Sequence, residues 1–173
     1  MVDYQKIATE SRIKCLELVH KAGTSHIGSL FSCADLMAVL FEKIDLDKDK
    51  FILSAGWKAC MLYFHLWRKG RITEEELNSY CQPGSKFIGL AEPMSKEIIC
   101  DKCLGTGFWE QYGRKDAVCL KCNGVGKIKQ EIISFAGGSM GYGLPAAVGF
   151  ALAKKLKGEE GKVCVLMSDG EMQ

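Results

Sequence analysis

The 173-residue sequence predicts an α/β fold in which a parallel sheet is flanked by helices. Two observations carry this prediction. Continuous apolar runs of strand length occur at 51–53 and 163–167, and segments of helix length alternate with them. Uninterrupted apolar strands are typical of parallel sheets, because helices cover both faces of such sheets. A third observation, a cysteine- and glycine-rich segment in the middle of the chain, predicts an insertion in this fold.

The elements before the second strand are predicted from periodicity and from end signals. An amphipathic helix is expected over 3–21, ending at Gly23. Ser32 and Asp35 have the spacing of a capping box, which predicts that another helix begins at Ser32. A mostly apolar helix is expected over 57–69.

The later helices have similar signals. Thr73 and Glu76 form a second capping box, which predicts a short helix to about residue 80. The last helix is expected over 144–157, directly before the second apolar strand.

Four cysteines form two copies of one phrase, C-x-x-C-x-G-x-G, with Cys100 and Cys103 in the first copy and Cys119 and Cys122 in the second. A two-residue gap lets neighbouring sulfurs hold one ion, and the glycines let backbone amides turn toward the sulfurs. Four thiolates complete a tetrahedral site, so these four cysteines are predicted to bind a structural zinc ion. The alternatives are a disulfide pair or four ordinary core cysteines.

The repeated phrase resembles the cysteine-rich module of J-domain chaperones, of which two of the usual four repeats are present. This resemblance implies a zinc ribbon and not a chaperone. We expect the ribbon over 95–129, inserted in a host domain formed by 1–94 and 130–173.

Composition limits the class of protein. An apolar fraction of 47% predicts a packed core, and a net charge of +2 argues against nucleic acid as the main partner. Neither a signal peptide nor a membrane span is expected from the sequence. The cysteines outside the repeated phrase occur singly, mostly in apolar stretches, which fits a reducing, cytoplasmic location: Cys15, Cys33, Cys60, Cys81 and Cys164.

Four segments, taken in order, resemble the N-terminal, diphosphate-binding half of transketolases, which use thiamine diphosphate. The first is the loop 22–29, which is similar to the family's glycine-histidine-x-glycine loop, and the second is 51–59, which is similar to a strand and loop with Ser-Lys-Gly-His-Ala. The third is 134–149, which is similar to Thr-Gly-Ser-Leu-Gly-x-Gly-Leu and its helix, and the fourth is 165–173, which is similar to the opening of the thiamine diphosphate motif. The resemblance implies a partial thiamine diphosphate-binding fold.

The chemistry of two of these segments agrees with the resemblance. Asp169, after a buried strand, is suited to hold a magnesium or calcium ion against a diphosphate, and Gly170 lets the backbone approach phosphate oxygens. Gly138 and Met140 lie in a turn before a helix, where free amides and small residues admit a phosphate or a flat ring. We expect these four residues to bind the cofactor, although the turn on its own could serve packing alone.

His26 lies in a loop rich in glycine and serine. The resemblance implies a catalytic residue that contacts the sugar substrate and assists proton transfer. Without the resemblance, an ordinary loop histidine is the simpler interpretation. The two other histidines of the family pattern are replaced by Trp57 and Leu90, which cannot relay a proton.

The resemblance therefore predicts an N-terminal part or split subunit of a transketolase-like enzyme, which transfers a two-carbon ketol unit between sugars, sugar phosphates among them. The later asparagine of the cofactor motif and the pyrimidine-binding half are not in this sequence, so the chain is expected to need a C-terminal partner half in a homo- or hetero-oligomer. Its expected cofactors are thiamine diphosphate and magnesium, beside the structural zinc.

The alternative function is a non-catalytic scaffold that uses the ribbon to bind a protein or nucleic acid. Three aromatic residues near basic residues at the ribbon tip suit such a contact. They are Phe108, Trp109 and Tyr112, beside Arg114 and Lys115.

Overall fold

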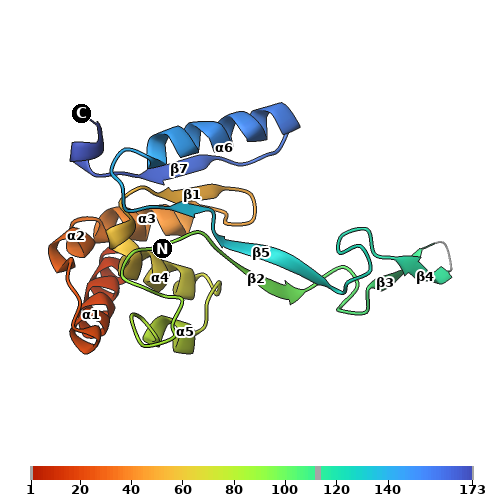
Figure 1. Ribbon diagram of the computed structural model, residues 1–173, viewed down its shortest axis with the longest axis horizontal. Helices are drawn as coiled ribbons and strands as arrows, with labels where there is room; N and C mark the ends of the chain where they lie inside the picture. Colours follow the sequence, from red (N-terminus) through yellow and green to blue (C-terminus); the bar gives the residue numbers. More distant parts are fainter. Residues whose placement is uncertain (1, 112–113, 173) are drawn as a thin grey trace. The chain divides into compact units, whose positions relative to one another are not determined.

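The computed structural model describes residues 2–111 and 114–172 (Figure 1). It divides into two compact units. The first, which we call the α/β unit, comprises Met1–Pro93 and Ile133–Gln173, and the second, which we call the cysteine unit, comprises Met94–Ile132.

The sheet of the α/β unit is parallel, as the apolar runs predict. Its order is β6 (Phe135–Ala136), β1 (Lys50–Leu53) and β7 (Val163–Leu166), and β1 pairs in parallel with both neighbours. Leu53 is level with Ala136 on one side and Leu166 on the other. The loops that follow the three strands therefore leave the sheet at the same edge.

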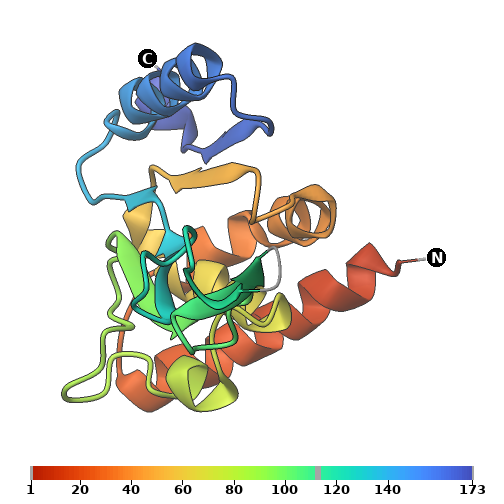
Figure 2. The ribbon, with the colours of Figure 1, turned by 90° about the vertical axis from the view of Figure 1, so that its right-hand side faces the viewer.

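Helices cover both faces of this sheet. Helix α6 (Gly143–Lys157) packs on β7 and β1. Figures 1 and 2 place α1 (Tyr4–Ala22), α3 (Ala34–Lys43) and α4 (Ala59–Arg68) on the opposite side of the sheet. Two shorter helices complete the unit, α2 (Ile27–Ser32) and α5 (Glu74–Asn78), together with the 3₁₀ turns η1 (Gly56–Lys58) and η2 (Asp169–Met172).

Helix α4 is the centre of the core. Its residues from Ala59 to Leu66 are all buried, and its Phe64 packs in one cluster with Ile7, Ala8 and Ala38. A helix that is buried on every side needs no polar face. The burial of α4 agrees with the mostly apolar helix predicted over 57–69.

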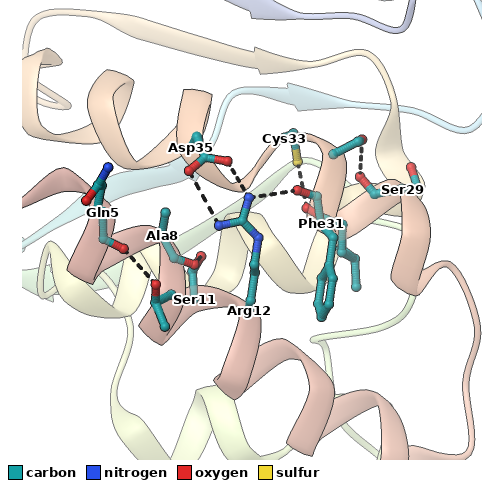
Figure 3. Close-up of polar contacts among 11 residues, drawn as sticks. Gln5, Ala8, Ser11, Arg12, Ser29, Phe31, Cys33 and Asp35 are labelled. Carbon is teal, nitrogen blue, oxygen red and sulfur yellow. Dashed lines mark hydrogen bonds and ion pairs between the residues drawn. The ribbon is translucent and has the colours of Figure 1, made fainter.

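The helix ends agree with the sequence in two cases and differ in one. Gly23 ends α1 in the left-handed conformation, and Thr73 and Glu76 form the predicted capping box of α5. The predicted helix start at Ser32 is wrong. Ser32 is the last residue of α2 and its hydroxyl donates to the Ser29 carbonyl at 2.8 Å, while Asp35 forms an ion pair with Arg12 (Figure 3).

The cysteine unit contains two small sheets. Strand β2 (Met94–Ile99) pairs with β5 (Lys127–Ile133), and β3 (Phe108–Gln111) forms an antiparallel pair with β4 (Arg114–Val118). No helix in the described part of the chain is both long enough and apolar enough to cross a membrane.

Candidate functional site

The four cysteines of the repeated phrase come together in the cysteine unit. Their sulfurs lie within 4.8 Å of one another, and all four residues are buried. The sulfurs of Cys100 and Cys119 are 3.8 Å apart, and those of Cys103 and Cys122 are 3.6 Å apart. Sulfurs about 2.3 Å from a tetrahedral zinc ion are about 3.8 Å from one another, whereas disulfide sulfurs are about 2.05 Å apart. The separations fit a metal site, and all four thiols are free.

The two copies of the phrase adopt the same backbone. The residue after the second cysteine is left-handed in both copies, with φ of 50° at Leu104 and 49° at Asn123. The last glycines, Gly107 and Gly126, match as well, with φ of 79° and 78°. The sequence repeat is therefore also a repeat in structure.

Each copy of the phrase packs its last glycine on the other copy. A Cβ atom on Gly107 would lie 2.1 Å from the Gly124 carbonyl oxygen, and one on Gly126 would lie 2.2 Å from the Gly105 carbonyl oxygen. No side chain fits at these two positions. The glycines thus allow the two cysteine pairs to approach one another.

Backbone amides face the sulfurs, as the glycines predict. The Gly126 amide donates to the Cys122 sulfur at 3.3 Å. Burial raises the pKa of Cys103, but hydrogen bonds from the Gly107 amide and the Cys122 thiol outweigh it and lower this pKa, whereas burial and the hydrogen bond with Cys103 raise the pKa of Cys122. A thiol with a lowered pKa loses its proton readily to a metal ion.

At the carboxyl edge of the parallel sheet, a serine joins distant segments. Ser54 directly follows β1 and is buried. Its hydroxyl donates to the Glu171 carboxylate and accepts the Gly143 amide at 3.0 Å. A Cβ atom on Gly143 would lie 2.2 Å from the Ser54 Cβ, so only glycine lets α6 start this close to the strand end.

Glu171 is the residue at this edge that the sequence analysis missed. Its carboxylate also accepts the Gly141 amide at 3.0 Å and the Ser168 amide at 2.7 Å. Burial raises the pKa of Glu171, but hydrogen bonds from Ser168, Ser54 and Gly141 outweigh it and hold this pKa below its ordinary value. The only signal in the sequence was a glutamate two residues after Asp169.

The predicted cofactor residues lie at the same edge. Asp169 and Gly170 are exposed in η2, and a Cβ atom on Gly170 would meet nothing within 4 Å. Gly138 and Met140 are exposed in the turn between β6 and α6. An exposed carboxylate beside open backbone fits a divalent ion and phosphate oxygens. Among the described residues, Asp169 belongs to no group of three or more potential metal ligands.

A cavity of about 580 Å³ unites the three positions where the family pattern has histidines. His26 supplies an imidazole, whereas Trp57 and Leu90 supply an indole and an alkyl group. The Trp57 indole donates to the Ser29 hydroxyl at 2.9 Å. The lining residues are Gly23, Thr24, Ser25, His26, Trp57, Tyr80, Cys81, Gly89 and Leu90.

Leu90 connects this cavity with the predicted cofactor turn. A Cβ atom on Gly138 would lie 3.0 Å from the Leu90 Cδ2, and one on Gly56 would lie 3.0 Å from its Cδ1. The leucine therefore packs on two glycines of the α/β unit. It lines the cavity with apolar atoms where an imidazole would have offered a hydrogen bond.

The predicted contact surface at the ribbon tip is only partly described. Phe108 is 48% exposed. Tyr112 and the side chains of Trp109, Arg114 and Lys115 lie outside the described residues. The surface stays a hypothesis.

A parallel sheet whose carboxyl edge gathers a glycine turn and an exposed aspartate is typical of α/β proteins that bind phosphate-containing ligands. The chain matches the family model of the transketolase, thiamine diphosphate binding domain over residues 3–117. It belongs to this family. The resemblance of the cysteine phrase to the chaperone module stays a prediction.

Curated relatives agree with the family. The chain is 27% identical to a transketolase of Rhodobacter capsulatus over 88% of its own length and 19% of the relative. It is 26% identical to one subunit of the apulose-4-phosphate transketolase of Phocaeicola vulgatus, over 94% of this chain and 48% of the relative. It is 27% identical to the 6-deoxy-6-sulfo-D-fructose transketolase subunit SqwG of a Clostridium species, over 98% of this chain and 53% of the relative. The chain thus spans about half the length of these two subunits.

Proposed function

We propose that this chain is the diphosphate-binding part of a transketolase-like enzyme that transfers a two-carbon ketol unit between sugars, sugar phosphates among them. Membership of the thiamine diphosphate binding family carries the proposal. Two relatives are named as transketolase subunits, which supports a separate partner half that supplies the pyrimidine-binding site. In this proposal, the complete enzyme is a homo- or hetero-oligomer that contains both halves.

The residues at the carboxyl edge of the sheet have distinct roles in this proposal. Asp169 would hold a magnesium or calcium ion, and Gly170 would face the diphosphate. Gly138 and Met140 would border the cofactor rings. Thiamine diphosphate, when bound, supplies the carbon centre that carries the ketol unit. Ser54 and Glu171 keep the strand ends, the glycine turn and η2 together, so that this edge is formed before the ligand arrives.

His26 is the proton-transferring residue in this proposal. Its imidazole lines the cavity beside Trp57 and can both donate a hydrogen bond to a substrate hydroxyl and accept one from it. With two of the three family imidazoles replaced, it is the one imidazole among the described residues that line the cavity. We therefore expect a narrower or altered range of sugars.

The four cysteines have a structural role in the proposal. They would bind one zinc ion with all four positions filled by thiolates, which leaves no position open for a substrate. The zinc would hold the cysteine unit folded and take no part in ketol transfer.

Calorimetry tests the cofactor proposal directly. Thiamine diphosphate and Mg²⁺ are titrated into the zinc-loaded chain, with and without a pyrimidine-binding half from the same source. We expect binding in the presence of the partner half, and weaker binding for Asp169→Asn. Asp47→Asn, a change in an exposed aspartate that pairs with Arg71, is the matched control. Absence of binding in both titrations would refute the enzyme proposal.

One observation favours a second function, a non-catalytic scaffold. Trp57 and Leu90 line the cavity at the two positions where catalysis would use imidazoles. If the scaffold proposal is correct, the assembled pair binds no thiamine diphosphate, and His26→Ala leaves its assembly unchanged. Ketol transfer that falls on His26→Ala would exclude the scaffold.

A further inference from the structure

The conformation of His26 is unfavourable for its residue type. Its φ is +74°, a left-handed value that L residues other than glycine adopt at a cost of about 1 kcal/mol. In the described part of the α/β unit, the other non-glycine residue with positive φ is Cys81, and both line the 580 Å³ cavity. Strain of this kind persists only where neighbouring groups hold the backbone. Neighbouring residues must therefore hold the backbone of the cavity wall in this conformation.

The helix that His26 begins is too short to give this support. Helix α2 spans six residues, from Ile27 to Ser32, and His26 provides no side-chain cap. Isolated helices of this length are not stable in water. The Leu30 amide donates to the His26 carbonyl at 3.0 Å, so loss of α2 would release His26 directly.

Lys58 holds α2 from inside the α/β unit. Its side chain comes from η1, and the residue is only 6% exposed. Its ammonium donates to the Ser29 carbonyl at 2.8 Å, to the Ser29 hydroxyl at 2.7 Å and to the Ser32 hydroxyl at 3.3 Å. A buried charge whose partners are neutral is costly to keep. Its three hydrogen bonds all go to one short helix.

Two more groups bind the same helix. The Trp57 indole donates to the Ser29 hydroxyl at 2.9 Å, so Ser29 joins Trp57 and Lys58. From α1, Arg12 donates to the Phe31 carbonyl at 3.4 Å and pairs with Asp35 (Figure 3). Cations at the carbonyl end of a helix stabilise it, because its last carbonyls carry partial negative charge.

We propose that Lys58 is a positioning residue, which holds α2 through Ser29 and thereby fixes His26 in its strained conformation in the cavity wall. The catalytic use of this geometry rests on the proposed function. In the family pattern Ser-Lys-Gly-His-Ala, the lysine is at the second position. Here Ala55 takes that position and Lys58 stands at the fifth, beside Trp57. The Trp57 and Lys58 replacements thus act together on Ser29.

Nuclear magnetic resonance on the zinc-loaded full chain tests this proposal without cofactor. The chain has three histidines, so the signals of the His26 ring can be assigned by substitution. Amide exchange at Leu30 reports on the bond to His26, and amides of α4 report on the core. The variants are Lys58→Met, Ser29→Ala and Ser29→Thr, with Lys86→Met as control, because Lys86 is an exposed lysine of the same unit.

Lys58→Met and Ser29→Ala should raise amide exchange at Leu30 at least about tenfold, because each removes hydrogen bonds to a charged group. The signals of the His26 ring should move away from their wild-type positions, because the backbone that orients this exposed ring is released, while amide exchange in α4 stays unchanged. Ser29→Thr keeps the hydroxyl and should restore the wild-type values. Unchanged exchange at Leu30, or an equal rise in α2 and α4, would overturn the proposal.

These outcomes are separate from those of the cofactor titration. A confirmed role of Lys58 together with absent thiamine diphosphate binding would leave the positioning of His26 intact and refute the enzyme proposal. Cofactor binding, together with unchanged amide exchange at Leu30 in the Lys58→Met variant, would support the enzyme proposal and refute the positioning role of Lys58.

Discussion

The α/β unit and the cysteine unit owe their order to different interactions. In the α/β unit, large apolar side chains such as Tyr63, Phe41 and Met37 are fully buried. In the cysteine unit, the cluster of buried side chains consists of the four cysteines, with Ile128 packed against it. A segment of about 40 residues is at the limit below which metals or disulfides usually replace an apolar core. One chain thus contains one unit that folds by burying apolar side chains and one unit that we expect to fold by binding a metal ion.

Zinc removal should have the largest effect, because it should unfold the cysteine unit and leave the α/β unit folded. Structural zinc contributes roughly 10–16 kcal/mol in small peptides. We therefore expect that a chelator, or Cys100→Ser, makes the protected amides of the cysteine unit exchange fast and leaves amide exchange in α4 unchanged. Metal analysis should find about one zinc per chain.

Cys164→Ser is the matched control for this experiment, because Cys164 is a single cysteine in β7. It should retain the zinc. Equal loss of order in both units after chelation would contradict the expectation that only the cysteine unit depends on zinc.

Glycine substitutions test the close contacts inside the α/β unit. Gly143→Ala places a Cβ atom against Ser54, and we expect it to lower the free energy of unfolding by about 3 kcal/mol. Gly149→Ala, in the same helix, meets nothing within 4 Å and should raise it by roughly 0.5–1 kcal/mol. Urea unfolding followed at the α/β unit measures both. Similar values for the two variants would show that the contact with Ser54 is unimportant.

Acid should weaken the α/β unit through His65. Burial lowers the pKa of His65 from 6.5 to about 3, and Arg68 and Lys69 add to this effect. Above pH 6.5 the imidazole is neutral in both states. As the pH falls from 6.5 toward 3, the unfolded chain binds a proton that the folded chain excludes, so the free energy of unfolding falls by up to about 1.4 kcal/mol per pH unit.

His65→Leu should reduce this dependence on pH, which urea unfolding at several pH values will measure. His20→Leu is the control, because His20 is exposed on α1. An equal pH dependence in His65→Leu and the wild type would exclude His65 as the acid-sensitive group.

The smallest effect is expected at Asp35. Arg12 holds the pKa of its carboxyl below the ordinary value by a hydrogen bond, but the carboxylate is exposed. Asp35→Asn should lower the melting temperature only slightly, and the difference should vanish in high salt because salt screens exposed pairs. A large loss that persists in salt would mean that this pair holds α3 on α1.

The sequence predicted the features that depend on residue type alone. Continuous apolar runs predicted the parallel strands, and the repeated phrase predicted the convergence of the cysteines. It could not predict features that depend on the path of the chain. Cys33, with φ of −107° and ψ of 0°, separates α2 from α3, so Ser32 ends α2 and does not begin α3. Burial of Lys58 likewise depends on where η1 places it, which no local pattern records.

The Ser54 hydroxyl joins residues that are far apart in the chain, with separations of 89 residues to Gly143 and 117 to Glu171. Contacts between such distant residues close long loops and therefore tend to form late in folding. The carboxyl edge of the sheet would then be the last part of the α/β unit to order and the first to open. A ligand bound there would slow the unfolding of the whole unit, so a longer lifetime of the folded chain would itself report occupancy.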